Sequence, residues 1–178
     1  MRLTDAQKSA ETPDNQTRKV LDYLDAENDY TRAIMQDTED LQEKLYGEIV
    51  GRIKQTDESL PYFKNGYWYY TRYEEGKEYP IYARKKGDLA AKEQIMLDAN
   101  EMAEGYDYYA IGGISVSPDN KMIAFGEDTV SRRVYHIRFK DLETGDFLDD
   151  VLENTSGSGA WANDNKTFFY TTKNQVSL

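Results

Sequence analysis

The chain has 178 residues, of which 33 are Asp or Glu and 22 are Lys or Arg, giving a formal net charge of -11. This charge argues against a nucleic-acid-binding protein, which would carry a basic patch. The absence of cysteine excludes disulfides, thiolate nucleophiles, zinc fingers and iron–sulfur clusters. The polar start contains no apolar run like that of a signal peptide, and no stretch approaches the roughly 20 apolar residues of a membrane span. We therefore expect a soluble, cytoplasmic protein without nucleic-acid or membrane partners, with the periplasm left open as an alternative location.

Residues 1–16 are polar, and we expect a poorly ordered start there. Over 17–54 the apolar residues recur at spacings of three and four, which predicts two helices, the second starting near Asp37 or Thr38, whose side chains can cap it. The apolar positions are Val20, Leu21, Leu24, Tyr30, Ala33 and Ile34 in the first helix and Leu41, Leu45, Ile49 and Ile53 in the second. Because two helices of this size enclose a small core, these stripes predict a larger partner surface.

The pattern changes after the second helix. Residues 55–61 are polar and end at Pro61, which predicts a hinge. Residues 62–178 consist of short runs rich in Tyr, Ile and Phe separated by turn residues, as in an antiparallel meander. Ten of the 15 tyrosines lie between Tyr62 and Tyr109, a density that favours strands. The expected strands cover 67–73, 79–85, 93–97, 114–116, 121–127, 133–140 and 146–152.

The sequence contains an internal repeat. Residues 114–125 (ISVSPDNKMIAF) align with 159–170 (GAWANDNKTFFY) at an offset of 45 residues, and 63–71 form a weaker copy. A period of about 40–50 residues with about four strands per repeat is typical of β-propeller blades. The fold class expected is therefore mixed but mainly β: two N-terminal α-helices, then antiparallel four-stranded blades of an incomplete β-propeller. Two blades would cover about 62–98 and 107–153, followed by the start of a third, whereas a propeller usually closes with about four to eight. Unpaired blade edges predict self-association of the fragment.

No group of residues predicts nucleophilic catalysis. The single histidine, His136, shares one face of its expected strand with Val134 and Arg138, and a structural role is favoured over that of a general base. Ser115 and Ser117 precede a turn rather than a strand-to-helix elbow, and no Gly-x-Ser-x-Gly motif is present. Residues 156–159 (SGSG) are interpreted as a flexible connection.

The signals for metal and ligand sites are equally weak. The cluster Asp141, Glu143 and Asp146 lacks the spacing of a calcium loop, and Gly112–Gly113 lacks the pattern of a phosphate loop. The carboxylates Asp22, Asp25, Glu27 and Asp29 are interpreted as a solvated helix face. The tyrosines are expected to fill space between sheets rather than to stack on sugars or bases. We therefore predict no catalytic, cofactor-binding or metal-binding residue in this chain.

Five ordered segments carry a family resemblance: 21–31 (LDYLDAENDYT), 41–45 (LQEKL), 51–57 (GRIKQTD), 66–72 (GYWYYTR) and 79–84 (YPIYAR). Together they resemble the N-terminal region of the oligopeptidase B branch of the prolyl oligopeptidase family of serine peptidases, from about residue 17 to the end. The resemblance implies a seven-bladed propeller and an α/β-hydrolase domain on which the N-terminal helices pack. The family's Ser-Asp-His triad lies in the C-terminal hydrolase portion, so no position of this sequence inherits a catalytic role.

By resemblance, the intact protein would hydrolyse short peptides after Arg or Lys, and its propeller would restrict substrate size. The expected partners are short basic peptides and a hydrolase domain in cis, and no cofactor is expected. Two alternatives stay open. One is a non-enzymatic β-propeller that binds a peptide or protein partner, and the other is a prolyl-specific relative with a different pocket.

Overall fold

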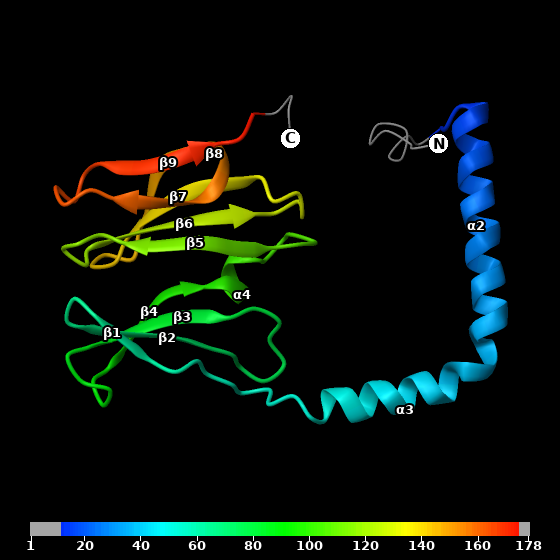
Figure 1. The fold of residues 1–178 in the computed structure, drawn as a ribbon, viewed down its shortest axis with the longest axis horizontal. Coiled ribbons are helices and arrows are strands. Elements are labelled where there is room, and N and C mark those ends of the chain that lie inside the picture. The colour runs from blue at the N-terminus through cyan, green and yellow to red at the C-terminus, as the bar shows by residue number, and fades with distance from the viewer. Residues whose placement is uncertain (1–11, 175–178) are drawn as a thin grey trace. The chain divides into compact units, whose positions relative to one another are not determined.

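The structure, a computed structural model, describes residues 12–174 and consists of a helical unit, Met1–Lys54, and a β unit, Gln55–Leu178, which are treated separately below. The helical unit contains α2 (Asn15–Met35), the 3-10 turn η1 (Gln36–Thr38) and α3 (Glu39–Val50) (Figure 1). No helix within residues 12–174 is long and apolar enough to cross a membrane.

Helix α2 begins slightly before the expected residue 17, because Asp14 caps it. The Asp14 carboxylate accepts hydrogen bonds from the backbone N–H groups of Gln16 at 2.9 Å and Thr17 at 2.8 Å. Thr38 precedes α3, but its hydroxyl donates to the carbonyl oxygen of Met35 at 2.7 Å, so its expected capping bond is not formed. The polar start before residue 12 lies outside the described residues.

The apolar stripes of the two helices are largely exposed to solvent. Half or more of the accessible surface remains on several of the large predicted positions: Tyr30, Ile34, Leu41, Ile49 and Ile53. Val20 and Leu21 are half-buried. The helical unit therefore leaves most of its apolar surface without a cover.

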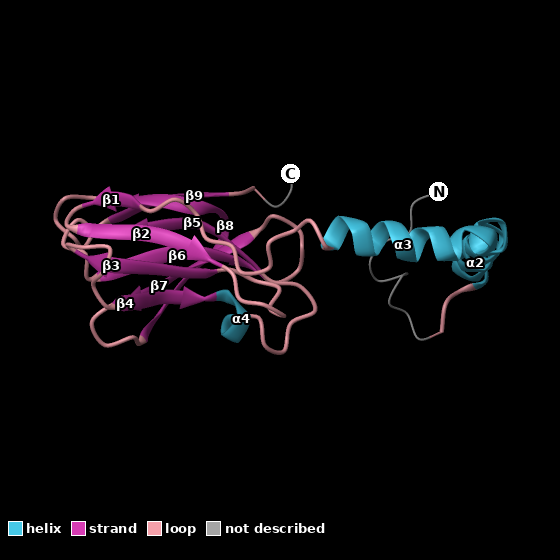
Figure 2. Cartoon of the chain, turned by 90° about the horizontal axis from the view of Figure 1, so that it is seen from below, coloured by secondary structure: helices cyan, strands magenta, loops and turns pink. Residues whose placement is uncertain are grey.

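The β unit contains two antiparallel sheets, each in chain order (Figure 1). The first contains β1 (Tyr62–Lys64), β2 (Tyr67–Arg72), β3 (Ile81–Lys86) and β4 (Glu93–Asp98), and is followed by the short helix α4 (Ala99–Met102). The second contains β5 (Ala110–Val116), β6 (Met122–Asp128), β7 (Tyr135–Asp141), β8 (Phe147–Trp161) and β9 (Phe168–Thr172). Figure 2 shows the strands of both sheets, coloured magenta, joined by short loops. The expected mainly β fold with propeller-like antiparallel blades is confirmed.

The segment before β1 is bonded to the first sheet. Within the expected hinge of 55–61, Ser59 donates its backbone N–H to the carbonyl of Thr71 at 2.8 Å, and Tyr73 donates to the carbonyl of Asp57 at 2.8 Å. The Ser59 hydroxyl also accepts from the Thr71 N–H at 2.9 Å. These bonds continue the β1–β2 pairing beyond the strands, so the chain from Asp57 onward is held against β2.

The sequence repeat is also a repeat of strand register. In the second sheet Ser115 pairs with Ala124, and their counterparts 45 residues later, Ala160 and Phe169, pair in the same way. The turns between the strands repeat too. Asn120 donates its N–H to the Ser117 carbonyl at 2.9 Å, and Asn165 donates to the Ala162 carbonyl at 3.2 Å. Both asparagines have positive φ, 64° and 60°, a conformation that Asn tolerates better than most residues.

Strand β8 corrects two expectations, the strand at 146–152 and the flexible connection at 156–159. It is one long strand that pairs with β7 in its first part and with β9 in its last part. Thr155, fully buried, donates its hydroxyl to the Tyr135 carbonyl at 3.0 Å and accepts from the Gly157 N–H at 3.0 Å. A Cβ on Gly113 would lie 1.8 Å from the Gly157 oxygen, and one on Gly126 would lie 2.5 Å from it. These glycines allow three backbones to approach closely; they do not make the segment flexible.

The core lies between the sheets, and a second part of it lies along the last strands of the second sheet. Tyr69, Met96 and Leu97 of the first sheet pack against Ile123 and Phe125 of the second, and all five are buried. A second cluster joins Phe139 to Trp161 and Phe168, whose rings meet edge to face at centroid distances of 5.1 to 5.7 Å. The last hairpin, β8 with β9, therefore packs its aromatic rings against Phe139 of β7 within the second sheet.

A side chain at Gly157 is predicted to meet a steric cost in addition to the cost of the positive φ. A Cβ at this position would lie 2.6 Å from the Tyr135 ring, whereas Gly145, with almost the same φ (86° against 85°), has no atom within 4 Å. Both alanine variants meet the left-handed backbone cost of about 1–2 kcal/mol. We expect Gly157→Ala to lower the free energy of unfolding by about 1–3 kcal/mol more than Gly145→Ala does. Urea unfolding followed by tryptophan fluorescence measures both; equal losses would contradict the close packing.

Asp128 predicts an acid-sensitive contribution to stability. Burial on its own would raise the pKa of this carboxyl, but backbone N–H donors, including those of Val130 at 2.9 Å and Arg133 at 2.7 Å, lower the pKa below its ordinary 3.8. Because the pKa is lower in the folded state, the stabilisation is complete above about pH 5 and is lost as the pH falls below 3.8 and through the lower pKa of the folded state. We expect Asp128→Asn to be less stable at neutral pH and to lose less stability between pH 5 and pH 3. An unchanged pH profile would contradict this role.

Candidate functional site between the two sheets

The hairpin turns of successive blades are joined in series by asparagine side chains. Asn120 donates its Nδ2–H to the carbonyl of Asn65, in the turn between β1 and β2, at 3.1 Å. Its Oδ1 accepts the Tyr69 hydroxyl at 3.2 Å. One repeat later, the Oδ1 of Asn165 accepts the backbone N–H of Asp119 at 2.9 Å. Each turn asparagine thus reaches back to the preceding blade and fixes the spacing between them.

A cleft of about 280 Å³ lies between the sheets. Its lining combines aromatic rings, hydroxyl groups and apolar side chains from β1, β2, β3, β4 and β5, among them Tyr62, Tyr69, Tyr82, Met96, Ile114 and Ser115. The rings of Tyr62 and Tyr69 stack with centroids 5.5 Å apart. Burial raises the pKa of the Tyr62 and Tyr82 hydroxyls, which keeps both protonated near neutral pH. The cleft is suited to bind a group by stacking and hydrogen bonding.

The structure separates the residues that were considered for nucleophilic catalysis. The Ser117 hydroxyl donates to Asp119 Oδ1 at 2.6 Å and accepts the Met122 N–H at 2.9 Å, so it is buried in the turn at the start of β6. His136 in β7 is half-buried and pairs in register with Glu127, at the end of β6. Ser117 therefore lies before the start of β6, whereas His136 lies beside its other end.

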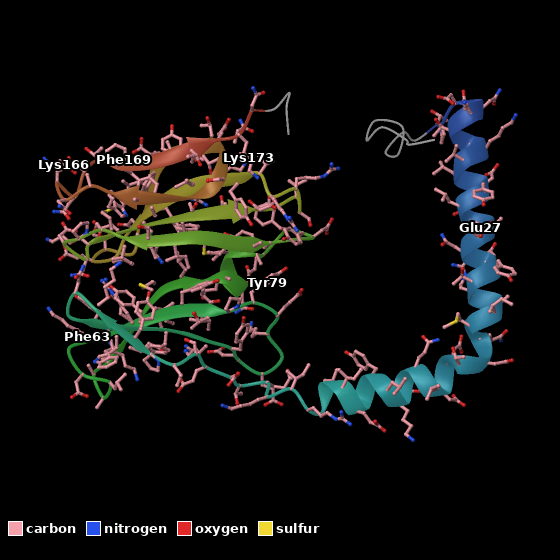
Figure 3. The ribbon with its side chains drawn as sticks, in the orientation of Figure 1. Glu27, Phe63, Tyr79, Lys166, Phe169 and Lys173 are labelled. Atoms are coloured by element: carbon pink, nitrogen blue, oxygen red, sulfur yellow. The ribbon has the colours of Figure 1, made fainter. Side chains whose placement is uncertain are left out.

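The remaining considered groups serve the backbone or face solvent. The Asp141 carboxylate accepts the N–H groups of Glu143 at 2.7 Å and Thr144 at 3.0 Å and so closes its own turn. Gly113 meets the Gly157 backbone, as described above. The acidic residues at 22–29 are exposed on α2, and Figure 3 labels Glu27 among them. Within residues 12–174 no three His, Asp or Glu side chains are placed to hold a metal ion.

The buried guanidinium of Arg84 escaped the sequence analysis. Arg84 is 2% exposed; its Nε donates to Gln94 Oε1 at 2.8 Å and its guanidinium lies 4.1 Å from the centre of the Tyr67 ring. Gln94 in turn donates to the Leu142 carbonyl, in the turn that follows β7 of the second sheet. The ring and amide thus hold a buried cation next to the junction of the sheets. The sequence offered one signal for this buried cation, namely an arginine at an alternate, inward-facing position of the expected strand.

On the other face of β2, Arg72 forms an ion pair with Glu93. Its Nη2 lies 3.0 Å from Glu93 Oε1, its Nε donates to Glu93 Oε2 at 3.1 Å, and the Tyr70 hydroxyl donates to the same carboxylate. The hydrogen bonds from Arg72 lower the pKa of Glu93, although its partial burial opposes them. The Glu93 carboxylate is charged, and Arg72 and Tyr70 occupy its oxygens. The ion pair ties the inner strand pair β2–β3 to β4.

The turn contacts predict a measurable coupling between the blades. We expect Tyr69→Phe and Asn120→Gly, which removes the side chain but tolerates positive φ, to show a coupling energy of about 0.5–1.5 kcal/mol in a double-mutant cycle of urea unfolding. Asn165→Gly alters the same turn position one repeat later and supplies the matched control. Its combination with Tyr69→Phe should be additive. Coupling of equal size in both cycles would overturn the assignment of this contact.

Comparison with known proteins identifies relatives of this chain by sequence. An alignment of 179 positions with dipeptidyl aminopeptidase BI of Pseudoxanthomonas mexicana is 42% identical and covers 92% of this chain and 25% of the relative. An alignment of 166 positions with protease 2 of Moraxella lacunata is 33% identical and covers 89% of this chain and 24% of the relative. The chain thus spans about a quarter of the length of these curated relatives, which are peptidases by name.

Solved structures of related proteins also superpose on this chain. Oligopeptidase B from Leishmania major is 33% identical and superposes with a TM-score of 0.78 over 87% of this chain and 22% of its own. Oligopeptidase B from Trypanosoma brucei, in a closed form with covalently bound antipain, is 31% identical, with a TM-score of 0.80 over 96% of this chain and 23% of its own. The resemblance to oligopeptidase B is confirmed. One family description, the prolyl oligopeptidase N-terminal beta-propeller domain, matches residues 12–178, and the chain belongs to that family.

Proposed function

We propose that this chain is the N-terminal part of a serine endopeptidase that hydrolyses short peptides after Arg or Lys. The observation that carries the proposal is the family match over 12–178, joined to relatives about four times as long that are peptidases by name. The catalytic serine, aspartate and histidine would come from an α/β-hydrolase domain in cis. The covalent antipain in the Trypanosoma brucei oligopeptidase B supports a nucleophilic mechanism in the family.

The helical unit supports the presence of that domain. The exposed large apolar residues of α2 and α3 recur on helical spacing, and full burial of each such side chain contributes about 1.5–3 kcal/mol. A hydrolase domain that covers Ile34, Leu45 and Ile49 would gain that contribution from each. We expect these residues to form the contact between the helices and the hydrolase.

The β unit supports a role in limiting substrate size. Its blades are joined through a buried core and through hydrogen-bonded turns, so they form a continuous wall rather than separate hairpins. Such a wall over an active site would exclude folded proteins and admit short peptides. The net charge of -11 favours the approach of basic peptides over acidic ones.

The test uses the intact protein and three fluorogenic peptides that differ only at the residue before the cleaved bond: Arg, Lys or Pro. We expect kcat/KM for the Arg and Lys peptides to exceed that for the Pro peptide by at least about a hundredfold, because a pocket built for a charged group rejects one that leaves its polar groups unpaired. Preference for Pro would assign the chain to a prolyl-specific relative instead and overturn the proposed specificity.

Two controls separate the parts of the proposal. A serine-directed phosphonate should label the intact protein and abolish cleavage, while the 178-residue chain alone should remain unlabelled. An intact protein that resists the phosphonate and cleaves none of the peptides would favour the non-enzymatic binding module. A folded protein containing the same Arg site should resist cleavage until it is unfolded; equal rates before and after unfolding would contradict the size limit.

A further inference from the structure

The cleft between the two sheets has a chemical character that cleavage after Arg or Lys does not use. In the described part of the chain, one charged side chain lines it, that of Lys64, and no carboxylate does. This contrasts with the whole chain, in which 33 acidic residues outnumber 22 basic ones. A bound cation would find no counter-ion in the cleft, so the cleft does not suit the basic side chain of a substrate.

We propose that this cleft binds an aromatic ring that carries a carboxylate, namely the C-terminal Phe, Tyr or Trp residue of a peptide. The ring would pack on Tyr62, and the carboxylate would pair with Lys64. The choice of a peptide rests on the proposed peptidase function, whereas the fit to an aromatic carboxylate rests on the cleft itself.

Strand β1 places the two recognition groups next to each other. Tyr62 and Lys64 are two residues apart, so their side chains leave the same face of the strand, about 6.6 Å apart along it. Phe63, which Figure 3 labels, lies between them and belongs to the opposite face. A ring and a carboxylate that are joined by a short linker, as within one amino-acid residue, can contact Tyr62 and Lys64 at once.

The walls of the cleft suit an aromatic ring. The Tyr62 ring stacks on the Tyr69 ring with an interplanar angle of 22°, and Tyr62 remains 60% exposed, so a further ring can extend the stack. The facing wall comes from β5 and includes Ile114 and Val116. The volume of about 280 Å³ lies just below the range of pockets for drug-sized ligands, which fits a single residue rather than a longer segment.

Polar groups of the cleft are available to a ligand. The Tyr69 hydroxyl is already bonded to Asn120. The hydroxyls of Tyr82 and Ser115 and the ammonium group of Lys64, by contrast, form no hydrogen bond with any residue of 12–174. None of these three groups is among the buried polar atoms that lack a partner, so water reaches them. A ligand would therefore replace water and would not have to break a bond within the protein.

The cleft is formed by the first two blades. Its walls come from residues 59–116. Asn120 sets the spacing of the two sheets here, because its side chain bonds both the Asn65 carbonyl and the Tyr69 hydroxyl. The geometry of the cleft therefore depends on two complete sheet faces and on hydrogen bonds between them.

A hollow of about 270 Å³ beside α4 provides a contrast. Glu127 and Arg138 line it, and their side chains lie 3.6 Å apart as an ion pair. The Tyr109 hydroxyl donates to the same carboxylate at 2.9 Å. The charges of that hollow are thus paired with each other, whereas Lys64 has no carboxylate partner within residues 12–174.

Ligand-observed NMR titration of the 178-residue chain with three matched peptides tests the proposal. They are acetyl-Gly-Phe, its C-terminal amide, and acetyl-Gly-Leu. We expect acetyl-Gly-Phe to bind with a dissociation constant of about 1 mM or tighter. It should bind about two- to fivefold more tightly than the amide, which lacks the charge, and about two- to tenfold more tightly than the Leu peptide, which lacks the ring. Equal binding of acid and amide, or no saturable binding in the low-millimolar range, would overturn the proposal.

Matched variants assign the two contacts. Lys64→Gln should abolish the preference for the acid over the amide, while Lys77→Gln, an exposed lysine in the turn between β2 and β3, should retain it. Tyr62→Leu should reduce the preference for the Phe peptide over the Leu peptide, while Phe63→Leu, at a 55% exposed residue on the opposite face, should not. Circular dichroism should show all four variants folded. Equal effects within either pair of variants would refute the assigned contact.

Two further arms separate the cleft from its occupant and from cleavage. The compound 3-phenylpropionate has the ring and the carboxylate but no peptide bond, and it should bind more weakly than acetyl-Gly-Phe. Tighter binding of this acid than of the peptide would overturn the peptide as occupant. The intact protein should bind acetyl-Gly-Phe as the 178-residue chain does, and loss of binding there would overturn the site. Failure of the intact protein to cleave Arg and Lys peptides, with this binding retained, would refute the proposed function and not the cleft.

Discussion

The β unit depends on one close contact between backbones, at Gly157. The chain must pass there from the outer part of one blade to the first strand of the next, and it does so directly over β5 and β6. Gly113 and Gly126 leave the space that the Gly157 carbonyl occupies, and Gly157 itself adopts a φ of 85° that other residues rarely take. Thr155 fixes the passage by bonding Tyr135 on one side and Gly157 on the other. Without this crossing, Trp161 and Phe168 would not reach Phe139, and the second cluster of the core would not form.

The blades are further held by contacts that repeat with the sequence. Apolar packing between sheets has no direction, and so it sets no angle or spacing by itself. The asparagine contacts do, because Asn120 must meet both Asn65 and Tyr69, and Asn165 must meet Asp119. Each blade is thus stabilised by its neighbour rather than by a shared centre, as in other repeat architectures, where the stability is a sum of units and interfaces. The tyrosine excess follows from the same arrangement, since Tyr69 offers a buried ring to the core and a hydroxyl to the turn.

The fold was largely predictable where local chemistry and spacing agreed. Asp-Asn-Lys at 119–121 and again at 164–166 predicted the same turn twice, and the 45-residue offset carried over to the paired residues. The prediction failed at 156–159 because glycine is compatible both with flexibility and with close packing, and only the approach of Gly113 decides between them. It also missed the cap at Asp14 and the buried Arg84, since a charged residue in a strand pattern gives no indication of the ring and amide that will surround it. For the candidate site, the sequence showed the tyrosines but not the cleft, which forms only where strands far apart in the sequence meet.

The two units differ in what they leave exposed, and the difference bears on what each can bind. The helices expose apolar side chains whose backbone groups are already bonded within the helix, so a partner gains from covering them mainly by burial of apolar surface. Such a surface accepts any complementary apolar face, and its specificity has to come from shape. Strand β9 exposes backbone donors and acceptors in a fixed order together with Phe169 and Tyr170, so its partner must be a strand in one register. Among the other sheet edges, β1 follows Pro61 and ends at Lys64, and β4 begins at Glu93 and ends at Asp98, features that oppose such pairing.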